Sequence, residues 1–283
     1  ITELANLYFR KGDYESARTF GLKGLAIDTY DPATNFVYGL ANSKLNRFND
    51  ARDGFDIAAL SASHRSAAYT ELAKLYFVQG NLQRALDFSL RATETNTSNV
   101  EAQKLSALIY RSQNNVNEAA ALLNKISEIN PLNQFIQTEN WLASGNNEDL
   151  KKLQSATRNE LPHETYLELA NWYLDLGVYK DAKAVLSAGP QNPESMYWSA
   201  FLEYKSGGDA YKTIIEQANS LSAELVFPFR PASSEIFEWV ATQTDNWKPR
   251  YYLALIYRGA KDQTKALTWI KACGDKPDFA PFY

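Results

Sequence analysis

The sequence predicts an all-α protein, an α-α superhelix of about eight helix-turn-helix repeats of which the later ones are irregular. The first observation is an alanine that recurs every 34 residues, at Ala17, Ala51, Ala85 and Ala119. A fixed period of this length is typical of solenoids built from paired helices. The second observation is composition, because 45% of the residues are hydrophobic and only 13 glycines and 10 prolines interrupt the chain. Each repeat of a solenoid contacts only its neighbours, so 283 residues can share one continuous core.

The four alanines are surrounded by the same types of residue. A small residue lies twelve positions earlier, a turn former five positions earlier and an apolar residue three positions earlier. In repeat order these are Ala5, Gly39, Ala73 and Ala107; Gly12, Asn46, Gly80 and Asn114; and Tyr14, Phe48, Leu82 and Val116. Small residues let two helices approach where they cross, and Gly or Asn can adopt the left-handed conformation that ends a helix. Each repeat is therefore predicted to be two antiparallel helices joined at the turn former.

This pattern resembles that of the tetratricopeptide repeat (TPR) family, which has a small residue, a tyrosine, a glycine, an aromatic residue and an alanine at these spacings. Tyr8, Tyr76 and Tyr110 supply the tyrosine, and Asn42 replaces it in the second repeat. The resemblance covers residues 1–131 as four regular repeats. It implies a concave groove that is lined by the first helix of each repeat and binds proteins or peptides.

An irregular region, 132–222, follows the regular repeats. Between Ala119 and Ala182 we expect one shortened repeat, with Trp141, Gly145 and the helical run 148–157 as its remains. Ala182 restores the pattern, because Ala170, Tyr173, Gly177 and Tyr179 precede it at the expected spacings. A further helix pair is predicted at about 193–206 and 209–220.

The C-terminal region, 223–283, is predicted to be a last repeat preceded by an extended insertion. The insertion is Phe-Pro-Phe-Arg-Pro at 227–231, because residues that precede prolines avoid the helical conformation. A helix is expected from about Ser233 to Thr242, and the last repeat at 247–275 is anchored by Ala266.

Composition argues against several classes of function. The formal net charge is −4 with basic and acidic residues intermixed, so no basic stripe is available for nucleic acid. No apolar run is long enough to span a membrane. His64 and His163 have no cysteine or second histidine at metal-ligand spacing, and no phosphate-binding glycine loop is present. We therefore expect this segment to have no catalytic activity, no cofactor and no metal, and Cys273 to be a small buried residue.

The family resemblance also predicts which side chains line the groove. They are Asn6, Phe9, Arg10, Phe36, Lys44, Lys74, Phe77, Lys104 and Arg111. Such a mixture of basic and apolar residues suits an extended acidic and hydrophobic peptide or a partner helix. Two alternatives stay open: the phenylalanines pack between repeats, or the lysines and arginines are only solvated surface.

One subgroup of the family clamps the carboxylate at the C-terminus of chaperones, using basic residues and asparagines in three successive repeats. Only Asn6 fits that pattern here. Thr2, Val37, Ala67 and Glu71 occupy the other clamp positions, so the sequence argues against this partner.

The C-terminal region also resembles the tail of a bacterial family of unknown function. The motifs are Phe-Pro-Phe-Arg-Pro (227–231), Trp-Lys-Pro-Arg-Tyr-Tyr-Leu (247–253) and Ala-Cys-Gly-Asp-Lys-Pro-Asp-Phe-Ala-Pro-Phe-Tyr (272–283). In that family a β-sandwich domain of the type seen in sugar mutarotases precedes the TPR region, which implies a link to carbohydrate metabolism. The aromatic residues near Trp239, Trp247 and Tyr251 either stack against sugars or fill the larger gaps of irregular repeats.

The sequence thus favours a non-enzymatic scaffold that binds protein or peptide in its groove. The alternative is the accessory helical region of a larger bacterial carbohydrate-active protein whose catalytic or sugar-binding domain lies outside this segment. Neither end carries the polar cap of a complete solenoid, so we expect an excised region. We also expect weak self-association through the apolar residues Phe279–Tyr283.

Overall fold

The computed structural model describes residues 1–277, which form 17 helices and no strand. The predicted all-α class is therefore confirmed. The chain divides into two compact units, Ile1–Leu150 and a second unit that begins at Lys151. Weak self-association was expected through Phe279–Tyr283. These residues lie outside the part of the chain that the structure describes.

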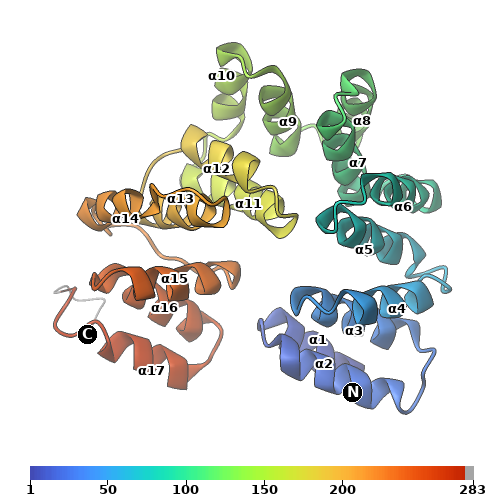
Figure 1. Ribbon diagram of the computed structural model, residues 1–283, viewed down its shortest axis with the longest axis horizontal. Coiled ribbons are helices and arrows are strands. Elements are labelled where there is room, and N and C mark those ends of the chain that lie inside the picture. Colours follow the sequence, from blue (N-terminus) through green and yellow to red (C-terminus); the bar gives the residue numbers. More distant parts are fainter. Residues whose placement is uncertain (278–283) are drawn as a thin grey trace. The chain divides into compact units, whose positions relative to one another are not determined.

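The first unit contains helices α1 to α9 and the start of α10 (Figure 1). Their bounds are α1 Thr2–Arg10, α2 Tyr14–Leu25, α3 Pro32–Lys44, α4 Phe48–Ala58, α5 Arg65–Val78, α6 Leu82–Thr95, α7 Val100–Ser112, α8 Val116–Ile129, α9 Gln134–Ser144 and α10 Asn147–Ala156. The first eight form the four predicted pairs, in which each odd-numbered helix packs on the helix that follows it.

The turns within these pairs form at the predicted residues. Gly12, Asn46, Gly80 and Asn114 all have positive φ, between 57° and 77°. The following helix begins two residues later in each pair, and Asp13 and Asn81 cap two of these helices by accepting a backbone N–H. Left-handed backbone that reverses the chain explains why Gly and Asn recur at this position.

The helix crossings are as close as the small residues predict. Ala17, Ala51 and Ala85 are completely buried. At Gly54 a Cβ atom would lie 2.7 Å from the carbonyl oxygen of Asn35, so α4 meets the backbone of α3 directly. Phe55 fills the adjacent space as part of a buried cluster with Leu72.

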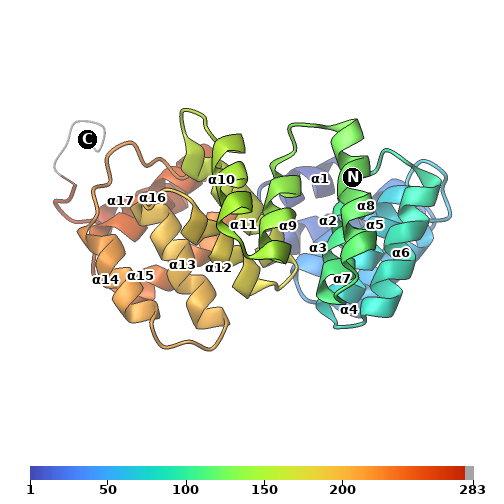
Figure 2. The same ribbon diagram turned by 90° about the horizontal axis from the view of Figure 1, so that it is seen from above.

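The first helices of neighbouring pairs also contact one another. These contacts join α1 to α3, α3 to α5, α5 to α7 and α7 to α9, whereas the second helices α2, α4, α6 and α8 make at most slight contacts with each other. A stack whose members touch on one side only curves toward that side, so the first helices line the inner face of this unit (Figures 1 and 2).

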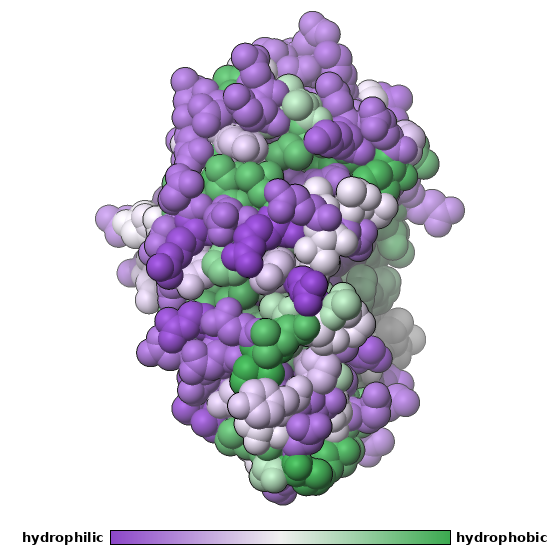
Figure 3. Space-filling model, turned by 90° about the vertical axis from the view of Figure 1, so that its right-hand side faces the viewer, coloured by the Kyte–Doolittle hydropathy of each residue, from purple (hydrophilic) through white to green (hydrophobic). Residues whose placement is uncertain are grey.

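The opposite side of the first unit is largely hydrophilic. Figure 3 views the side where α4, α6 and α8 lie, and its hydrophobic residues form small areas separated by polar ones. Isolated apolar residues of this kind are usual on a soluble surface.

Helices α9 and α10 lie where the shortened repeat is expected, but they make at most slight contacts with each other and are not a packed pair. Gly145 ends α9 with a φ of 64°, and α10 covers most of the predicted run 148–157. The C-terminal half of α10 belongs to the second unit, where Gln154 donates to the carbonyl of Ala188 and Thr157 bonds to the hydroxyl of Tyr166. The predicted regions 1–131, 132–222 and 223–283 were defined by how regular the repeat pattern is. The two compact units are instead defined by which residues contact one another, so their boundary lies elsewhere.

The second unit contains seven further helices. They are α11 Pro162–Asp175, α12 Tyr179–Ala188, α13 Pro193–Lys205, α14 Tyr211–Ser220, α15 Ala232–Gln243, α16 Trp247–Gly259 and α17 Gln263–Lys271. Helices α11 and α12, α13 and α14, and α16 and α17 are packed pairs, while α15 is single and contacts both α13 and α16. The expected extended insertion precedes α15. Ala182 is buried as predicted, but Ala266 is only half-buried.

Candidate functional site

The structure places all nine predicted groove residues on first helices of the first unit. Asn6, Phe9 and Arg10 lie on α1, Phe36 and Lys44 on α3, Lys74 and Phe77 on α5, and Lys104 and Arg111 on α7. These four helices form the contacting series described above, which we call the first-helix face.

The three predicted phenylalanines differ in what their rings contact. The Phe36 ring lies 5.8 Å from that of Phe55 and 6.0 Å from that of His64, so it packs between the second and third pairs. The Phe9 ring lies 5.5 Å from Tyr14 within the first pair. Phe77 is half-buried. For Phe36 the structure therefore supports the alternative of packing between repeats.

Lys74 is held by two carboxylates rather than being a solvated cation. Its Nζ lies 3.1 Å from Glu71 on the same helix and 3.2 Å from Glu101 on α7. Burial by itself lowers the pKa of Lys74, but the attraction and hydrogen bonds of the two carboxylates outweigh it and raise the pKa above its ordinary value. Lys74 therefore joins α5 to α7 as a permanently charged group.

The two basic residues of α7 are likewise engaged. Lys104 lies 4.0 Å from Glu101, and its Nζ is 5.3 Å from the centre of the Phe135 ring on α9. Arg111 makes a two-pronged contact with Glu139 of α9, with distances of 2.7 and 3.0 Å. Glu139 is only 1% exposed, so this pair is shielded from solvent.

Neutral side chains connect the same helices. The hydroxyls of Thr2 on α1 and Thr34 on α3 are 2.6 Å apart. Asn99, the N-cap of α7, donates to the hydroxyls of Ser66 and Thr70 on α5 at 2.8 and 2.9 Å. The first-helix face is thus cross-linked from pair to pair.

The sequence analysis missed the role of Glu71, Glu101 and Glu139. The spacing of three residues from Glu71 to Lys74 and from Glu101 to Lys104 is a signal for pairs within a helix. No sequence signal pairs Lys74 with Glu101 or Arg111 with Glu139, because these contacts require two repeats to be stacked. Lys74, Lys104 and Arg111 are consequently matched by acids, and Arg10 is an exposed cation. Lys44 is exposed as well, but it is not without an interaction partner.

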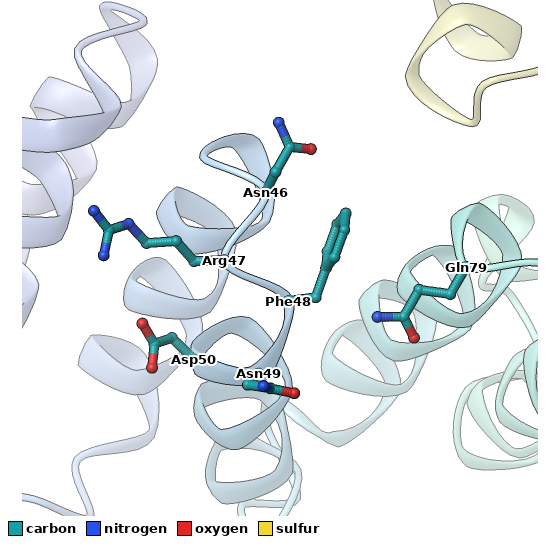
Figure 4. A pocket seen from close by; sticks show the side chains of 6 residues that line it. All are labelled: Asn46, Arg47, Phe48, Asn49, Asp50 and Gln79. Carbon is teal, nitrogen blue, oxygen red and sulfur yellow. The ribbon is translucent and has the colours of Figure 1, made fainter.

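One open pocket lies beside this face, where the turn between α3 and α4 meets the end of α5 (Figure 4). Its volume is about 450 Å³, and it is lined by Asn46, Arg47, Phe48, Asn49, Asp50 and Gln79. Figure 4 shows the Phe48 ring standing between the turn and Gln79. Arg47 is 3.9 Å from Glu15, a distance that leaves the guanidinium weakly held.

The aromatic residues near Trp239 and Tyr251 pack largely against their neighbours. Tyr251 is 2% exposed, which argues against the alternative that it stacks on a sugar. The Trp239 ring stacks on Tyr204 at 4.8 Å and lies 5.5 Å from Phe201. The alternative, that these residues fill the gaps of irregular repeats, agrees with this packing.

The basic residues of the C-terminal motif bind backbone carbonyls. Lys248, which is 5% exposed, donates to the carbonyls of Ala218, Asn219 and Leu221 at the end of α14. Arg250 donates to those of Asp245 and Asn246 at 2.7 and 3.1 Å. Burial lowers the pKa of Lys248 and raises that of Cys273 to about 11, so the thiol is unreactive.

Residues 1–277 contain no group of histidines, cysteines and acids arranged to hold a metal ion. No helix in this part of the chain combines the length and the apolar character that crossing a membrane requires.

Comparison with known proteins agrees with this geometry. Residues 39–99 match the family model of the tetratricopeptide repeat. A solved tetratricopeptide repeat protein from Parabacteroides merdae is 16% identical, with a TM-score of 0.50 over 84% of this chain and 96% of that chain. The fold is that of a tetratricopeptide repeat protein. The TPR pattern in the alanines and turn formers therefore describes the observed helix pairs.

Two other solved TPR structures match with lower TM-scores. The C-terminal part of a TPR protein from Cytophaga hutchinsonii is 14% identical over 99% of this chain and 96% of that chain, with a TM-score of 0.41. YrrB, described as a TPR protein with an unusual peptide-binding site, is 19% identical over 56% of this chain and 85% of its own, with a TM-score of 0.45. No curated protein matches the sequence.

Proposed function

We propose that this TPR chain is a non-enzymatic scaffold that binds an extended segment or helix of another protein on the first-helix face. The observation that carries the proposal is the series of contacts from α1 through α3, α5 and α7, which builds one continuous inner surface. Cross-links between pairs hold this surface in one shape. A rigid surface loses little conformational entropy when a peptide binds, which favours affinity.

The charges of the face refine the expected partner. Lys74, Lys104 and Arg111 are matched by carboxylates, so an acidic peptide gains little from them. Arg10 on α1 is exposed. We propose that acidic residues of a partner bind near this side chain, and that its apolar residues contact Phe77.

Selection of peptides from a random library on the intact chain tests this function. Affinities of the selected peptides would be measured by calorimetry for Arg10→Glu and Phe77→Ala. We expect each variant to weaken binding about tenfold, which corresponds to roughly 1.4 kcal/mol. Variants of Lys74 or Arg111 are unsuitable, because they break internal ion pairs.

Matched controls lie on second helices. Lys125→Glu and Val116→Ala change an exposed cation and an exposed apolar residue of α8 and should leave affinity unchanged. Equal losses from both sets of variants, or affinities that ignore Arg10 and Phe77, would contradict binding on the first-helix face.

A second proposal rests on the three C-terminal motifs: the chain is the helical region of a larger carbohydrate-active protein. The intact mass and N-terminal sequence of the protein from its source test this proposal. A preceding segment with alternating apolar and polar residues, typical of a β-sandwich, supports it. Flanks made only of further helical repeats would refute it.

A further inference from the structure

Glu194, near the start of α13, is a carboxylic acid without adequate partners. It is completely buried. Its Oε1 accepts a hydrogen bond from the hydroxyl of Ser233 on α15 at 3.2 Å, while its Oε2 has no hydrogen-bond partner. The indole of Trp198 donates to the same serine at 3.2 Å. A buried carboxylate with a single neutral donor is poorly stabilised, so this site disfavours the charged form.

Two charged groups, Glu164 and Arg230, act electrostatically on this acid, and His163 lies beside Glu164. Arg230, from the segment before α15, pairs with the carboxylate of Glu164 on α11 and donates to its backbone carbonyl at 3.0 Å. His163 Nε2 lies 3.3 Å from the other Glu164 oxygen. Glu164 raises and Arg230 lowers the pKa of Glu194, so both carboxylates compete for one guanidinium.

The remaining elements packed on α13 add no charge that could compensate Glu194. Tyr252 of α16 is an electrostatic neighbour whose buried hydroxyl has no hydrogen-bond partner. From α14, Asn219 binds the hydroxyl of Tyr197 at 2.7 Å. Lys183 of α12 is paired with Glu203, more than two turns away along α13. Burial, reinforced by Glu164, raises the pKa of Glu194 to about 8.

The same arginine positions the segment 222–231. Val226 and Pro228 are buried, whereas Leu225, Phe227 and Phe229 are 69%, 55% and 62% exposed. The guanidinium of Arg230 lies 4.7 Å from the centre of the Phe229 ring. Arg230 thereby ties an extended segment with outward-facing aromatic rings to α11.

We propose that Glu194 is a proton-dependent latch for the segment 222–231 and the first turn of α15. When Glu194 is protonated and neutral, Arg230 pairs with Glu164 alone, and the segment stays attached to α11. Loss of the proton places a second negative charge beside Glu164. Hydrating that charge requires Ser233, which bonds to Glu194, to move away from α13, so opening of the segment becomes easier.

Hydrogen exchange of the intact chain between pH 5 and 9, corrected for intrinsic rates, tests the latch. Protection of the amides in 222–234 should fall by up to tenfold per pH unit between about pH 5 and 8 and then level off. Protection in the first unit should stay constant. Glu194→Gln, which remains neutral, should abolish the dependence, while the matched control Glu235→Gln on the exposed side of α15 should keep it.

Carbon-13 NMR of the glutamate carboxyl groups in the unaltered chain provides a second test that needs no variant. One glutamate should titrate above pH 7. The proposal is overturned if no glutamate does so, if Glu194→Gln retains the pH dependence, or if His163→Asn removes it while Glu194→Gln does not.

Discussion

At the residue scale, several basic side chains of this protein bind the protein itself. Lys74 and Arg111 bind carboxylates of neighbouring helices, and Lys248 binds the carbonyl groups that end α14. A charged group can be buried only when such partners replace water. When a substitution removes one member of such a pair, the loss in unfolding free energy therefore depends on how well the remaining polar group can be hydrated.

Arg111→Ala should lower the free energy of unfolding by about 3 kcal/mol, because it leaves the carboxylate of Glu139 buried without its guanidinium. Arg52→Ala, which removes an exposed pair with Asp53 at 3.3 Å, should cost less than about 1 kcal/mol. Denaturant titration of both variants measures the difference. Equal losses of unfolding free energy in the two variants would mean that the burial of Glu139 does not increase the cost of removing its partner.

At the scale of the element, each helix pair depends on how closely its two backbones approach. Gly54 sits where α4 crosses α3, and only the missing side chain permits that distance. Gly259 near the end of α16 has open space around it. The same substitution should therefore have opposite effects at the two sites.

Gly54→Ala should destabilise the chain by about 2 kcal/mol, since the new methyl group meets backbone atoms that cannot move aside. Gly259→Ala should stabilise it by up to about 1 kcal/mol, because alanine favours the helix. Thermal unfolding of both variants checks the signs. A stabilising Gly54→Ala would show that the crossing is looser than the structure indicates.

The end of α14 offers a second test at this scale. Lys248→Met keeps the length of the side chain but leaves the carbonyls of Asn219 and Leu221 without their shared donor. We expect a loss of about 2 kcal/mol. Lys212→Met, on an exposed position of α14, is the control and should be nearly neutral. An unchanged melting temperature for Lys248→Met would argue that water replaces the amine.

At the scale of the whole molecule, the chain is two compact units whose helices mostly contact near neighbours in sequence. Stability in such arrays is approximately the sum of repeat and interface contributions. Each unit should therefore fold without the other.

A fragment of residues 1–146 should keep a helical circular dichroism spectrum and unfold cooperatively. A fragment of residues 1–114 should melt at a lower temperature, because α7 loses the partner helix α8. Melting curves of the two fragments test this expectation. A fragment 1–146 without a transition would show that the first unit depends on the second.

The stability of the second unit should depend on pH through Glu194. Its pKa of about 8 in the folded state lies above the ordinary value of 4.5, so the folded state binds an extra proton between these limits. With respect to this group, the unfolding free energy should therefore be highest below about pH 4.5 and fall by roughly 4 kcal/mol as the pH rises to 8. Denaturant titrations of the unaltered chain and Glu194→Gln at several pH values measure the fall. If the unfolding free energy of Glu194→Gln fell with pH as steeply as that of the unaltered chain, Glu194 would not be the group responsible.

Much of the structure of the first unit could be predicted, because helix pairs and turns are determined by residues that lie close together in the sequence. The 34-residue period records where two helices cross, and the turn formers record where the chain must reverse. Asn46 and Asn114 were predicted as turns and have the left-handed backbone that a turn requires. Gly145 ends α9 with left-handed backbone, as a turn former does, but the helices on either side of it do not pack as a pair.

The sequence by itself thus determined the helix pairs, their order and the helices that carry the candidate face. Only the tertiary structure decided what the charged side chains do. Lys74 meets Glu101, Arg111 meets Glu139, and Arg230 meets Glu164 only after separate helices have come together. Helix periodicity depends on neighbours a few residues apart, whereas the environment of a charge depends on every element that surrounds it. For that reason the acidic partners of Lys74, Lys104 and Arg111 were not predicted, and neither was the buried acid Glu194.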